Sequence, residues 1–227
     1  MKVARLDDRP EIFYSLQGEG ASQGAPSLFL RLAGCNLACS WCDTSYARRR
    51  GDAVGMTANE IAMAFDALAP ECGRVVITGG EPLLQQDAME ELLPLLGGRH
   101  VEIETNGTLE ASGALLERID QWNISPKLAH AGQAGELAPR PAVLRLFADT
   151  GRAWFKFVVR GEEDWPEIDA LMRACGLSKE RILLMPLATT REQLAAARQE
   201  LAALCLRRGV RFADRLHIAI WGSRKGI

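Results

Sequence analysis

The sequence predicts a single-domain α/β protein that folds as an incomplete, open (βα)6-type TIM-like barrel over residues 1–227. Three observations lead to this prediction. Short β-rich runs alternate with longer helical patterns, several of these runs are almost continuously apolar, and no repeat or linker-like composition divides the chain. Such alternation is typical of βαβ units, and continuous apolar runs are typical of parallel strands covered by helices. Six or seven units are fewer than a closed eightfold barrel uses.

Each predicted strand is given together with the residues that directly follow it: 27–34, 74–80, 100–107, 122–127, 153–160, 181–188 and 214–221. Polar residues follow three consecutive strands, at Thr78–Glu81, Glu104–Gly107 and Ser125–Lys127. Because active sites of such folds gather at the carboxyl ends of the strands, we expect these segments to lie together. His217 is predicted to lie within the last strand.

The predicted helices carry recognisable start and stop signals. Thr57 and Glu60 have the spacing of a capping box, and Thr190 and Gln193 repeat it before a second helix. Gly97-Gly98 is expected to end a helix of residues 86–96, because glycine readily takes the left-handed conformation there. The apolar faces of the two capped helices are predicted to include Ile61, Phe65 and Leu68, and Leu194, Leu201 and Leu204.

Composition narrows the class of protein. The chain has a net charge of −2, with 48% hydrophobic and 25% charged residues, so nothing favours nucleic acid or an anionic membrane as partner. No apolar run approaches the ~20 residues of a membrane-spanning helix, and the N-terminal segment lacks the apolar core of a signal peptide. These features predict a cytoplasmic protein, in which clustered cysteines bind metal or do redox chemistry more often than they form disulfides.

Three of the six cysteines, Cys35, Cys39 and Cys42, are crowded into one C-x₃-C-x₂-C run. A structural zinc site would need a fourth ligand, and no histidine shows ligand-like pairing with this run. Buried apolar cysteines or a disulfide would also account for the run. An iron–sulfur cluster with one open iron is favoured, because three thiolates would leave one iron of a cubane for an exogenous ligand. The remaining cysteines, Cys72, Cys175 and Cys205, are interpreted as isolated thiols of the core or near the surface.

The cysteine run, which follows a predicted strand, and the T-G-G-E-P segment at 78–82 together resemble the radical S-adenosylmethionine (SAM) superfamily. The resemblance implies a [4Fe-4S] cluster on Cys35, Cys39 and Cys42, whose open iron takes the amino and carboxylate groups of SAM. Reductive cleavage of SAM then gives a 5′-deoxyadenosyl radical that abstracts a substrate hydrogen. The glycines at 79 and 80 would let backbone carbonyls approach the methionyl ammonium, and Glu81 would support that contact.

Segments outside the superfamily motifs are similar to those of the 7-carboxy-7-deazaguanine synthase family, from about residue 10 onward. They are FYSLQGEG, FLR, CDT, ETNG, SPK, FKFV and HxxxWG. This resemblance implies the Mg²⁺-dependent ring contraction of 6-carboxy-5,6,7,8-tetrahydropterin to 7-carboxy-7-deazaguanine with release of ammonia, in the queuosine and 7-deazapurine pathway. It also implies a reductant such as flavodoxin, a homodimer, and no protein side chain as catalytic acid or base. SAM would be regenerated in each turnover.

A pterin presents a planar amino-pyrimidinone edge, which the glycine-flanked Gln17 and Glu19 can meet with side-chain and backbone groups. Arg31 offers a charge-assisted partner for the substrate carboxylate. Each of these residues also has a structural interpretation. Gln17 and Glu19 could form a glycine-rich surface turn, and Arg31 could form an ion pair at the rim. His217 could be a structural histidine, and Ile227 could be a frayed end. The predicted substrate contacts are Leu16, Gln17, Gly18, Glu19, Arg31, Thr78, His217 and Ile227. We call residues 13–20 the substrate loop and residues 35–44 the cluster loop.

By spacing alone Asp43-Thr44 resembles a helix cap, whereas the family resemblance implies that Thr44 is a Mg²⁺ ligand. The resemblance further implies that Glu104 and Asn106 bind the SAM ribose and that residues 185–188 flank the adenine. The full predicted SAM set is Trp41, Cys42, Asp43, Gly80, Glu81, Glu104, Asn106, Ser125, Pro126, Lys127, Met185, Pro186, Leu187 and Ala188. A glycyl-radical activating enzyme and a non-catalytic Fe–S or zinc module are the competing interpretations; the substrate loop and Asp43-Thr44 argue against the former.

Overall fold

Six parallel strands form the centre of the protein in a computed structural model, which describes residues 1–132 and 139–227. They are β5 (Pro26–Leu32), β7 (Arg74–Gly79), β8 (His100–Thr105), β9 (Gln121–Ile124), β10 (Ala153–Val159) and β11 (Ile182–Pro186). They pair in this order, and each is followed by one helix of the outer layer. These helices are α1 (Ala58–Leu68), α2 (Gln86–Leu92), α3 (Gly113–Arg118), α4 (Pro141–Asp149), α5 (Trp165–Cys175) and α6 (Arg191–Arg208).

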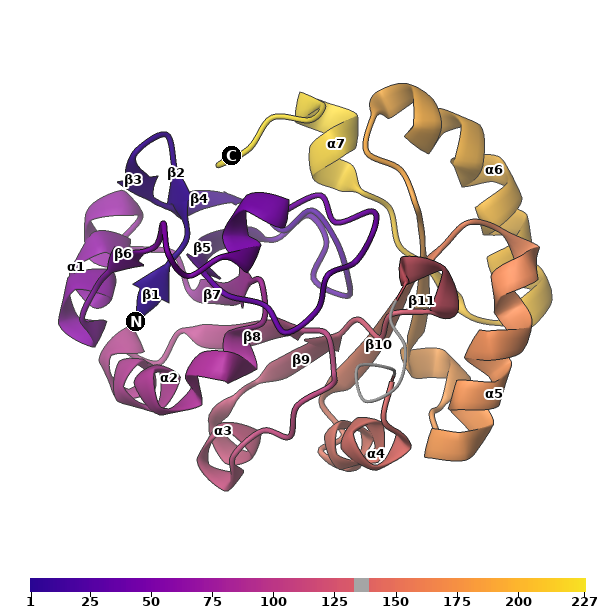
Figure 1. Cartoon of the computed structure of the whole chain (residues 1–227), viewed down its shortest axis with the longest axis horizontal. Helices are drawn as coiled ribbons and strands as arrows, with labels where there is room; N and C mark the ends of the chain where they lie inside the picture. Colours follow the sequence, from indigo (N-terminus) through magenta and orange to yellow (C-terminus); the bar gives the residue numbers. More distant parts are fainter. Residues whose placement is uncertain (133–138) are drawn as a thin grey trace.

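Figure 1 shows these helices as an arc around the outside of a curled sheet. The gap in the arc contains α7 (Leu216–Trp221) and the residues that follow it. At one edge of the sheet β4 (Ile12–Leu16) pairs antiparallel with β5, which also pairs with β1 (Lys2–Val3) and, through it, β6 (Val54–Gly55). At the other edge lies the two-residue β12 (Arg211–Phe212), and β2 (Arg5–Leu6) and β3 (Arg9–Pro10) form a separate hairpin. The prediction of an open (βα)6 barrel is confirmed.

Side chains alternate between the two faces of each parallel strand, and the two faces have different chemistry. One face is apolar and packs against the helices; Ile77, Ile103 and Phe157 on this face are all fully buried. Their chain neighbours turn to the opposite face, inside the barrel, and these are Thr78, Glu104 and Lys156. The outer face therefore supplies the core, and the inner face is left for polar groups.

The helix starts follow the predicted chemistry. Thr57 caps α1 with the reciprocal hydrogen bonds of a capping box, and Ile61 and Phe65 are fully buried. Leu68, expected on the same apolar face, is instead 47% exposed because α1 ends there. Thr190 caps α6 by accepting a hydrogen bond from Gln193 N at 3.3 Å.

The prediction of a seventh strand at residues 214–221 is wrong. Its place beside β11 is taken by β12, and residues 216–221 form α7. A short apolar run does not distinguish a strand from a helix by periodicity, and here no neighbouring strand is left for it to pair with. His217 therefore lies on a helix.

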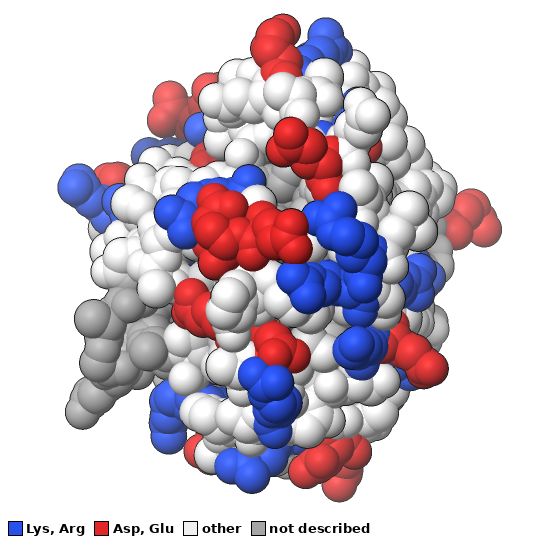
Figure 2. All heavy atoms as spheres, turned by 90° about the vertical axis from the view of Figure 1, so that its right-hand side faces the viewer, with Lys and Arg blue, Asp and Glu red and all other residues white. Residues whose placement is uncertain are grey.

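The face that carries α5 and α6 mixes acidic and basic side chains (Figure 2). Glu162, for example, accepts hydrogen bonds from both Arg207 and Arg208, at 2.9 and 2.8 Å. This interspersion agrees with the small net charge. None of the helices among the described residues has the length and apolar character that crossing a bilayer demands.

The fully buried Phe65 anchors α1 to the sheet, so Phe65→Ala should lower the free energy of unfolding by about 3–5 kcal/mol through a cavity. Met63 on the same helix is 70% exposed, and Met63→Ala should change the free energy of unfolding by no more than about 0.5 kcal/mol. Urea denaturation followed by circular dichroism measures both. Equal effects of the two variants would contradict this packing.

Candidate active site

The inner face of the barrel opens into a cavity of about 340 Å³. Its wall includes inner-face residues of β5 and β7–β11, parts of the substrate and cluster loops, and residues 222–227. Polar residues predicted at the strand ends therefore do converge, as the parallel topology requires.

Cys35, Cys39 and Cys42 are free thiols on the wall of this cavity. Leu37 N donates to Cys35 Sγ at 3.4 Å, the kind of hydrogen bond that tunes a metal-bound sulfur. Burial raises the pKa of Cys35 and of Cys39, which favours the protonated thiols, and a metal bound by thiolates would act in the opposite direction. The donor set thus suits an iron–sulfur cluster with three thiolate ligands. Within residues 1–132 and 139–227, no three or more His, Cys, Asp and Glu side chains are arranged to hold a single metal ion.

Gly79 and Gly80 let the end of β7 touch the start of the cluster loop. A Cβ on Gly80 would lie 2.2 Å from Gly34 O and 2.9 Å from Cys35 Cβ. Gly79 has φ +146°, and a Cβ there would lie 2.1 Å from the Leu32 carbonyl oxygen. Glu81 N in turn donates to Gly34 O at 2.8 Å. The two glycines therefore set the position of the first cysteine.

The carboxylate of Glu81 is fully buried and turned away from the cavity. It accepts hydrogen bonds from Thr105 Oγ1 at 2.7 Å, Asn106 N at 2.8 Å and Leu83 N at 3.0 Å. Burial raises the pKa of this carboxyl, and the three hydrogen bonds act in the opposite direction. Glu81 braces the ends of β7 and β8 against each other.

Asn106 braces the cluster loop from the same strand end. Its Nδ2 donates to Asn36 Oδ1 at 2.9 Å, and Asn36 Nδ2 donates to Thr108 Oγ1 at 2.8 Å. Its Oδ1 accepts from Thr108 N and Thr108 Oγ1. The amide of Asn106 is therefore occupied on both sides, although the residue lies on the cavity wall.

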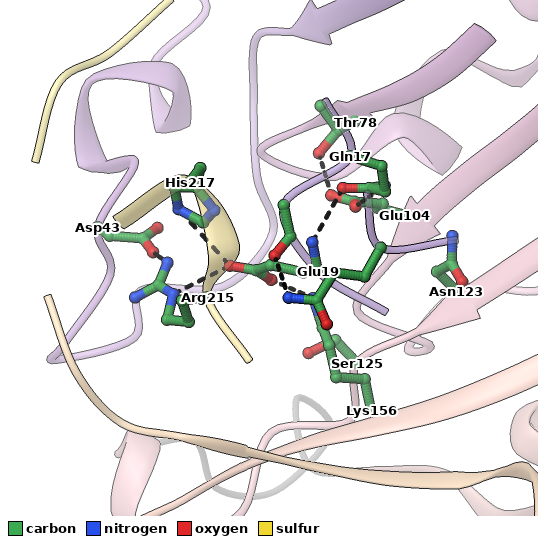
Figure 3. Close-up of polar contacts among 12 residues, drawn as sticks. Gln17, Glu19, Asp43, Thr78, Glu104, Asn123, Ser125, Lys156, Arg215 and His217 are labelled. Atoms are coloured by element: carbon green, nitrogen blue, oxygen red, sulfur yellow. Dashed lines mark hydrogen bonds and ion pairs between the residues drawn. The ribbon is translucent and has the colours of Figure 1, made fainter. Parts of the chain in front are cut away.

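Glu19 lies at the centre of a cluster of ionisable side chains drawn from three parts of the chain (Figure 3). Lys156 from β10 pairs with one of its carboxylate oxygens, Arg215 Nε donates to the other at 3.0 Å, and His217 Nε2 lies 3.9 Å from it. Burial would raise the pKa of Glu19, but Lys156 and Arg215 outweigh it and hold the pKa well below its usual range. Burial lowers the pKa of His217, so its imidazole is neutral at pH 7.

Glu104 collects hydrogen bonds from two predicted substrate contacts. Gln17 Nε2 donates to Glu104 Oε1 at 3.0 Å, and Thr78 Oγ1 donates to Glu104 Oε2 at 2.8 Å. Gln17 Oε1 also accepts from Glu19 N at 3.2 Å, which fixes the turn of the substrate loop. A residue predicted for SAM and residues predicted for the substrate thus share one hydrogen-bonded group (Figure 3).

Arg31 forms an ion pair through Nε with Glu11, at 2.9 Å, and Tyr46 Oη donates to the same carboxylate. No further hydrogen bond of the Arg31 guanidinium is found within residues 1–132 and 139–227. Its two terminal nitrogens therefore remain available to an anion in the cavity. Glu11 therefore orients the guanidinium group of Arg31.

At the end of the cluster loop Thr44 Oγ1 donates to Asp43 Oδ1 at 2.8 Å. Across the cavity, Lys127 Nζ donates to Ser125 O at 2.9 Å and to Ser125 Oγ at 2.8 Å. This ammonium lies 5.8 Å from the centre of the Trp41 ring. Burial lowers the pKa of Lys127.

Most of the predicted site residues lie on the wall of this one cavity. They are Leu16, Gln17, Gly18, Glu19, Arg31, Cys35, Cys39, Trp41, Cys42, Asp43, Thr44, Thr78, Gly80, Glu104, Asn106, Ser125, Lys127, Met185, Leu187, His217 and Ile227. Four predicted SAM contacts do not reach the wall: Glu81, Pro126, Pro186 and Ala188. Glu81 is held by the Thr105 hydroxyl and two backbone N–H groups. The other three alternate with wall residues along the chain, so they face the other way.

Several wall residues escaped sequence reasoning. Lys156, Arg215, Glu11 and Tyr46 all make ion pairs or hydrogen bonds around the cavity, and Asn36 holds the cluster loop from behind. Lys156 did leave a signal, because a lysine inside the apolar run FKFVV must be paired if it is buried. Arg215 had none, since its segment was expected to be a strand.

The chain resembles known proteins over nearly its whole length. A sequence profile of the Radical SAM superfamily matches residues 30–131. The 7-carboxy-7-deazaguanine synthase of Pyrobaculum aerophilum is 40% identical over 220 residues, which cover 95% of each chain. That of Halobacterium salinarum is 36% identical over 94% of this chain and 90% of its own. The crystal structure of QueE from Escherichia coli superposes with a TM-score of 0.66 at 27% identity, covering 91% of this chain and 92% of that one.

Replacing Gly80 with alanine should displace the cluster loop, because the new Cβ meets Gly34 and Cys35. We expect a loss of about 1–3 kcal/mol in unfolding free energy from overpacking, together with a reduced iron content after anaerobic reconstitution. Gly113→Ala is the matched control, because its Cβ meets nothing within 4 Å. Gly80→Ala protein with the iron content and stability of the parent would disprove the close approach.

Proposed function

Because the chain belongs to the 7-carboxy-7-deazaguanine synthase family of radical SAM enzymes, we propose that its cavity binds the pterin substrate at the substrate loop and SAM beside the cluster loop. The family reaction contracts 6-carboxy-5,6,7,8-tetrahydropterin to 7-carboxy-7-deazaguanine, and the chain is such a synthase. One observation carries the assignment of residues. Three free thiols and the ion-paired carboxylate of Glu19 lie on the wall of the same cavity.

Membership of the radical SAM superfamily implies a [4Fe-4S] cluster and SAM. Cys35, Cys39 and Cys42 would hold this cluster, which would supply the electron for the reductive cleavage of SAM. What the rest of the chain contributes is binding, orientation and exclusion of water.

Glu19 would recognise the amino-pyrimidinone edge of the pterin. Its lowered pKa keeps the carboxylate ionised, and an ionised carboxylate only accepts hydrogen bonds, which matches the N–H groups of that edge. Gln17 and Thr78 hold Glu104 in place beside it. The neutral imidazole of His217 can donate or accept at the same edge.

The carboxylate of the substrate would bind Arg31. Glu11 occupies only Nε of this guanidinium, which leaves a pair of terminal N–H groups in the geometry that suits a carboxylate. Mg²⁺ on Thr44 would strengthen this grip, since Thr44 lies on the same wall and Mg²⁺ prefers oxygen ligands and retains waters. Ile227 and Leu16 would complete the wall around the pterin.

SAM would lie between the cluster loop and the ends of β9 and β11. Trp41, Met185 and Leu187 offer an apolar surface for adenine, and Lys127 and Ser125 offer polar groups beside it. Glu104 accepts hydrogen bonds from Gln17 and Thr78, and its carboxylate has further lone pairs that could accept from a ribose hydroxyl. The side-chain amide of Asn106 is already engaged with Asn36 and Thr108. A reductant such as flavodoxin and a homodimeric assembly stay predictions from the family.

An anaerobic assay with reductant, SAM, Mg²⁺ and 6-carboxytetrahydropterin, followed by mass spectrometry, tests the activity. We expect the deazapurine product from reconstituted enzyme and none from Cys39→Ala. Product that also forms without Mg²⁺ would remove the role given to Thr44. Fully clustered enzyme that forms no deazapurine would refute the assignment of substrate.

Glu19→Gln should reduce kcat/KM for the pterin about 10- to 100-fold, because it replaces a charge-assisted acceptor by a neutral amide. The loss should be mainly in KM for the pterin, with iron content unchanged. Glu163→Gln, at an exposed ion pair, serves as the matched control and should leave both constants within about twofold. A Glu19→Gln enzyme with normal KM would argue against recognition of the pterin at this residue.

A further inference from the structure

Arg215 lies where three segments of the chain meet beside the cavity. Its Nε donates to Glu19 Oε1 at 3.0 Å and its Nη2 pairs with Asp43 (Figure 3). Its Nη1 donates to the Ala188 carbonyl at 2.6 Å. Glu19 belongs to the substrate loop, Ala188 follows β11, and Asp43 directly follows Cys42 in the cluster loop. With only 6% of its surface exposed, one side chain connects all three segments.

The contacts continue from Arg215 into the cluster loop. Asp43 accepts from Arg215 through Oδ2 and from Thr44 Oγ1 through Oδ1, at 2.8 Å for the latter. Glu19 has a second cation in Lys156, but Arg215 is the only cation that pairs with Asp43 among residues 1–132 and 139–227. The position of Asp43 and Thr44 therefore depends on Arg215 more than that of Glu19 does.

The fork of a guanidinium is what makes this connection possible. Arginine presents its donors in a fixed plane, so Nε and the two Nη groups cannot be re-aimed independently. A ligand that donates a hydrogen bond to Glu19 Oε1 shares this oxygen with Arg215, because the carboxylate has acceptor sites beyond those that Arg215 and Lys156 use. Any shift of Arg215 in response is then transmitted to Asp43 and Ala188.

We propose that Arg215 is a positioning residue that couples occupancy of Glu19 by the pterin to the conformation of Asp43-Thr44, and hence to the affinity of the cluster loop for SAM. The proposal rests on the proposed function, because it requires the pterin to bind at Glu19. Coupling between two binding sites is reciprocal, so the pterin and SAM would each change the affinity for the other.

Docking of α7 does not explain why Arg215 is placed here. That helix is already held by a hydrogen bond from Leu216 N to Gly18 O at 2.8 Å and by Arg191, which donates to Ala219 O at 3.2 Å and to Ile220 O. Arg191 touches neither Glu19 nor Asp43. It therefore provides a matched control for a purely structural role.

The test measures the dissociation constant of SAM on anaerobically reconstituted, unreduced enzyme, with and without saturating 6-carboxytetrahydropterin. We expect the pterin to change SAM affinity in the parent enzyme by about fivefold or more. Arg215→Lys retains the charge but not the fork, and the two constants should then agree within about twofold. Arg191→Lys should keep the parental ratio of the two SAM dissociation constants, measured without and with the pterin. A residue with a merely structural role would change both constants and leave their ratio as it was.

A parental ratio in Arg215→Lys overturns the proposal, and so does a parent enzyme that binds both ligands without any coupling. Failure of the parent to bind the pterin at all would instead refute the proposed function. If Arg215→Lys does not fold, judged by circular dichroism and iron content, Asp43→Asn breaks the same connection at its other end. Asp43 is partly exposed, and a parental ratio in Asp43→Asn would overturn the proposal equally.

Discussion

The two-residue period of the parallel strands is the constraint on which the rest of this protein depends. Every second side chain on β7, β8 and β10 is buried under the helices, and the residues between them point into the barrel. The same six strands can therefore supply a continuous apolar core on the outside and a row of polar groups on the inside. Because each strand ends at the same rim, these polar groups meet the cluster loop, which carries the three cysteines.

Polar groups inside a barrel are costly unless they are paired, and the charges here are balanced. Glu19 and Asp43 face Lys156 and Arg215, and Glu11 faces Arg31. Removing one partner would leave a buried charge without compensation, so the cluster behaves as a unit. The benefit is an arrangement fixed before any ligand arrives, which is what recognition of a flat, polar molecule requires.

Residues in loop motifs could be predicted from the sequence, whereas residues that depend on tertiary pairing could not. The cysteine run, Gly79-Gly80 and the strand-end residues have local patterns that demand a specific backbone or ligand. The pattern did not reveal that Glu81 turns away from the cavity, because that outcome depends on the Thr105 hydroxyl and on Asn106 N, which lie at the end of β8 and directly after it. Arg215 and Glu11 acquire their roles only from partners far away in sequence, so no local pattern could mark them.

The last predicted strand is a helix, and this helix covers the open side of the barrel (Figure 1). A further long strand beside β11 would have extended the sheet, but β12 has only two residues and the chain then turns inward as α7. Beyond α7, Ser223 Oγ donates to Thr189 O at 2.8 Å and Lys225 lies 4.3 Å from the centre of the Tyr46 ring. This last segment thus reaches from the β11 side to the cluster-loop side (Figure 1). Six strands leave a gap, and a helix fills it where a seventh strand would only have widened the sheet.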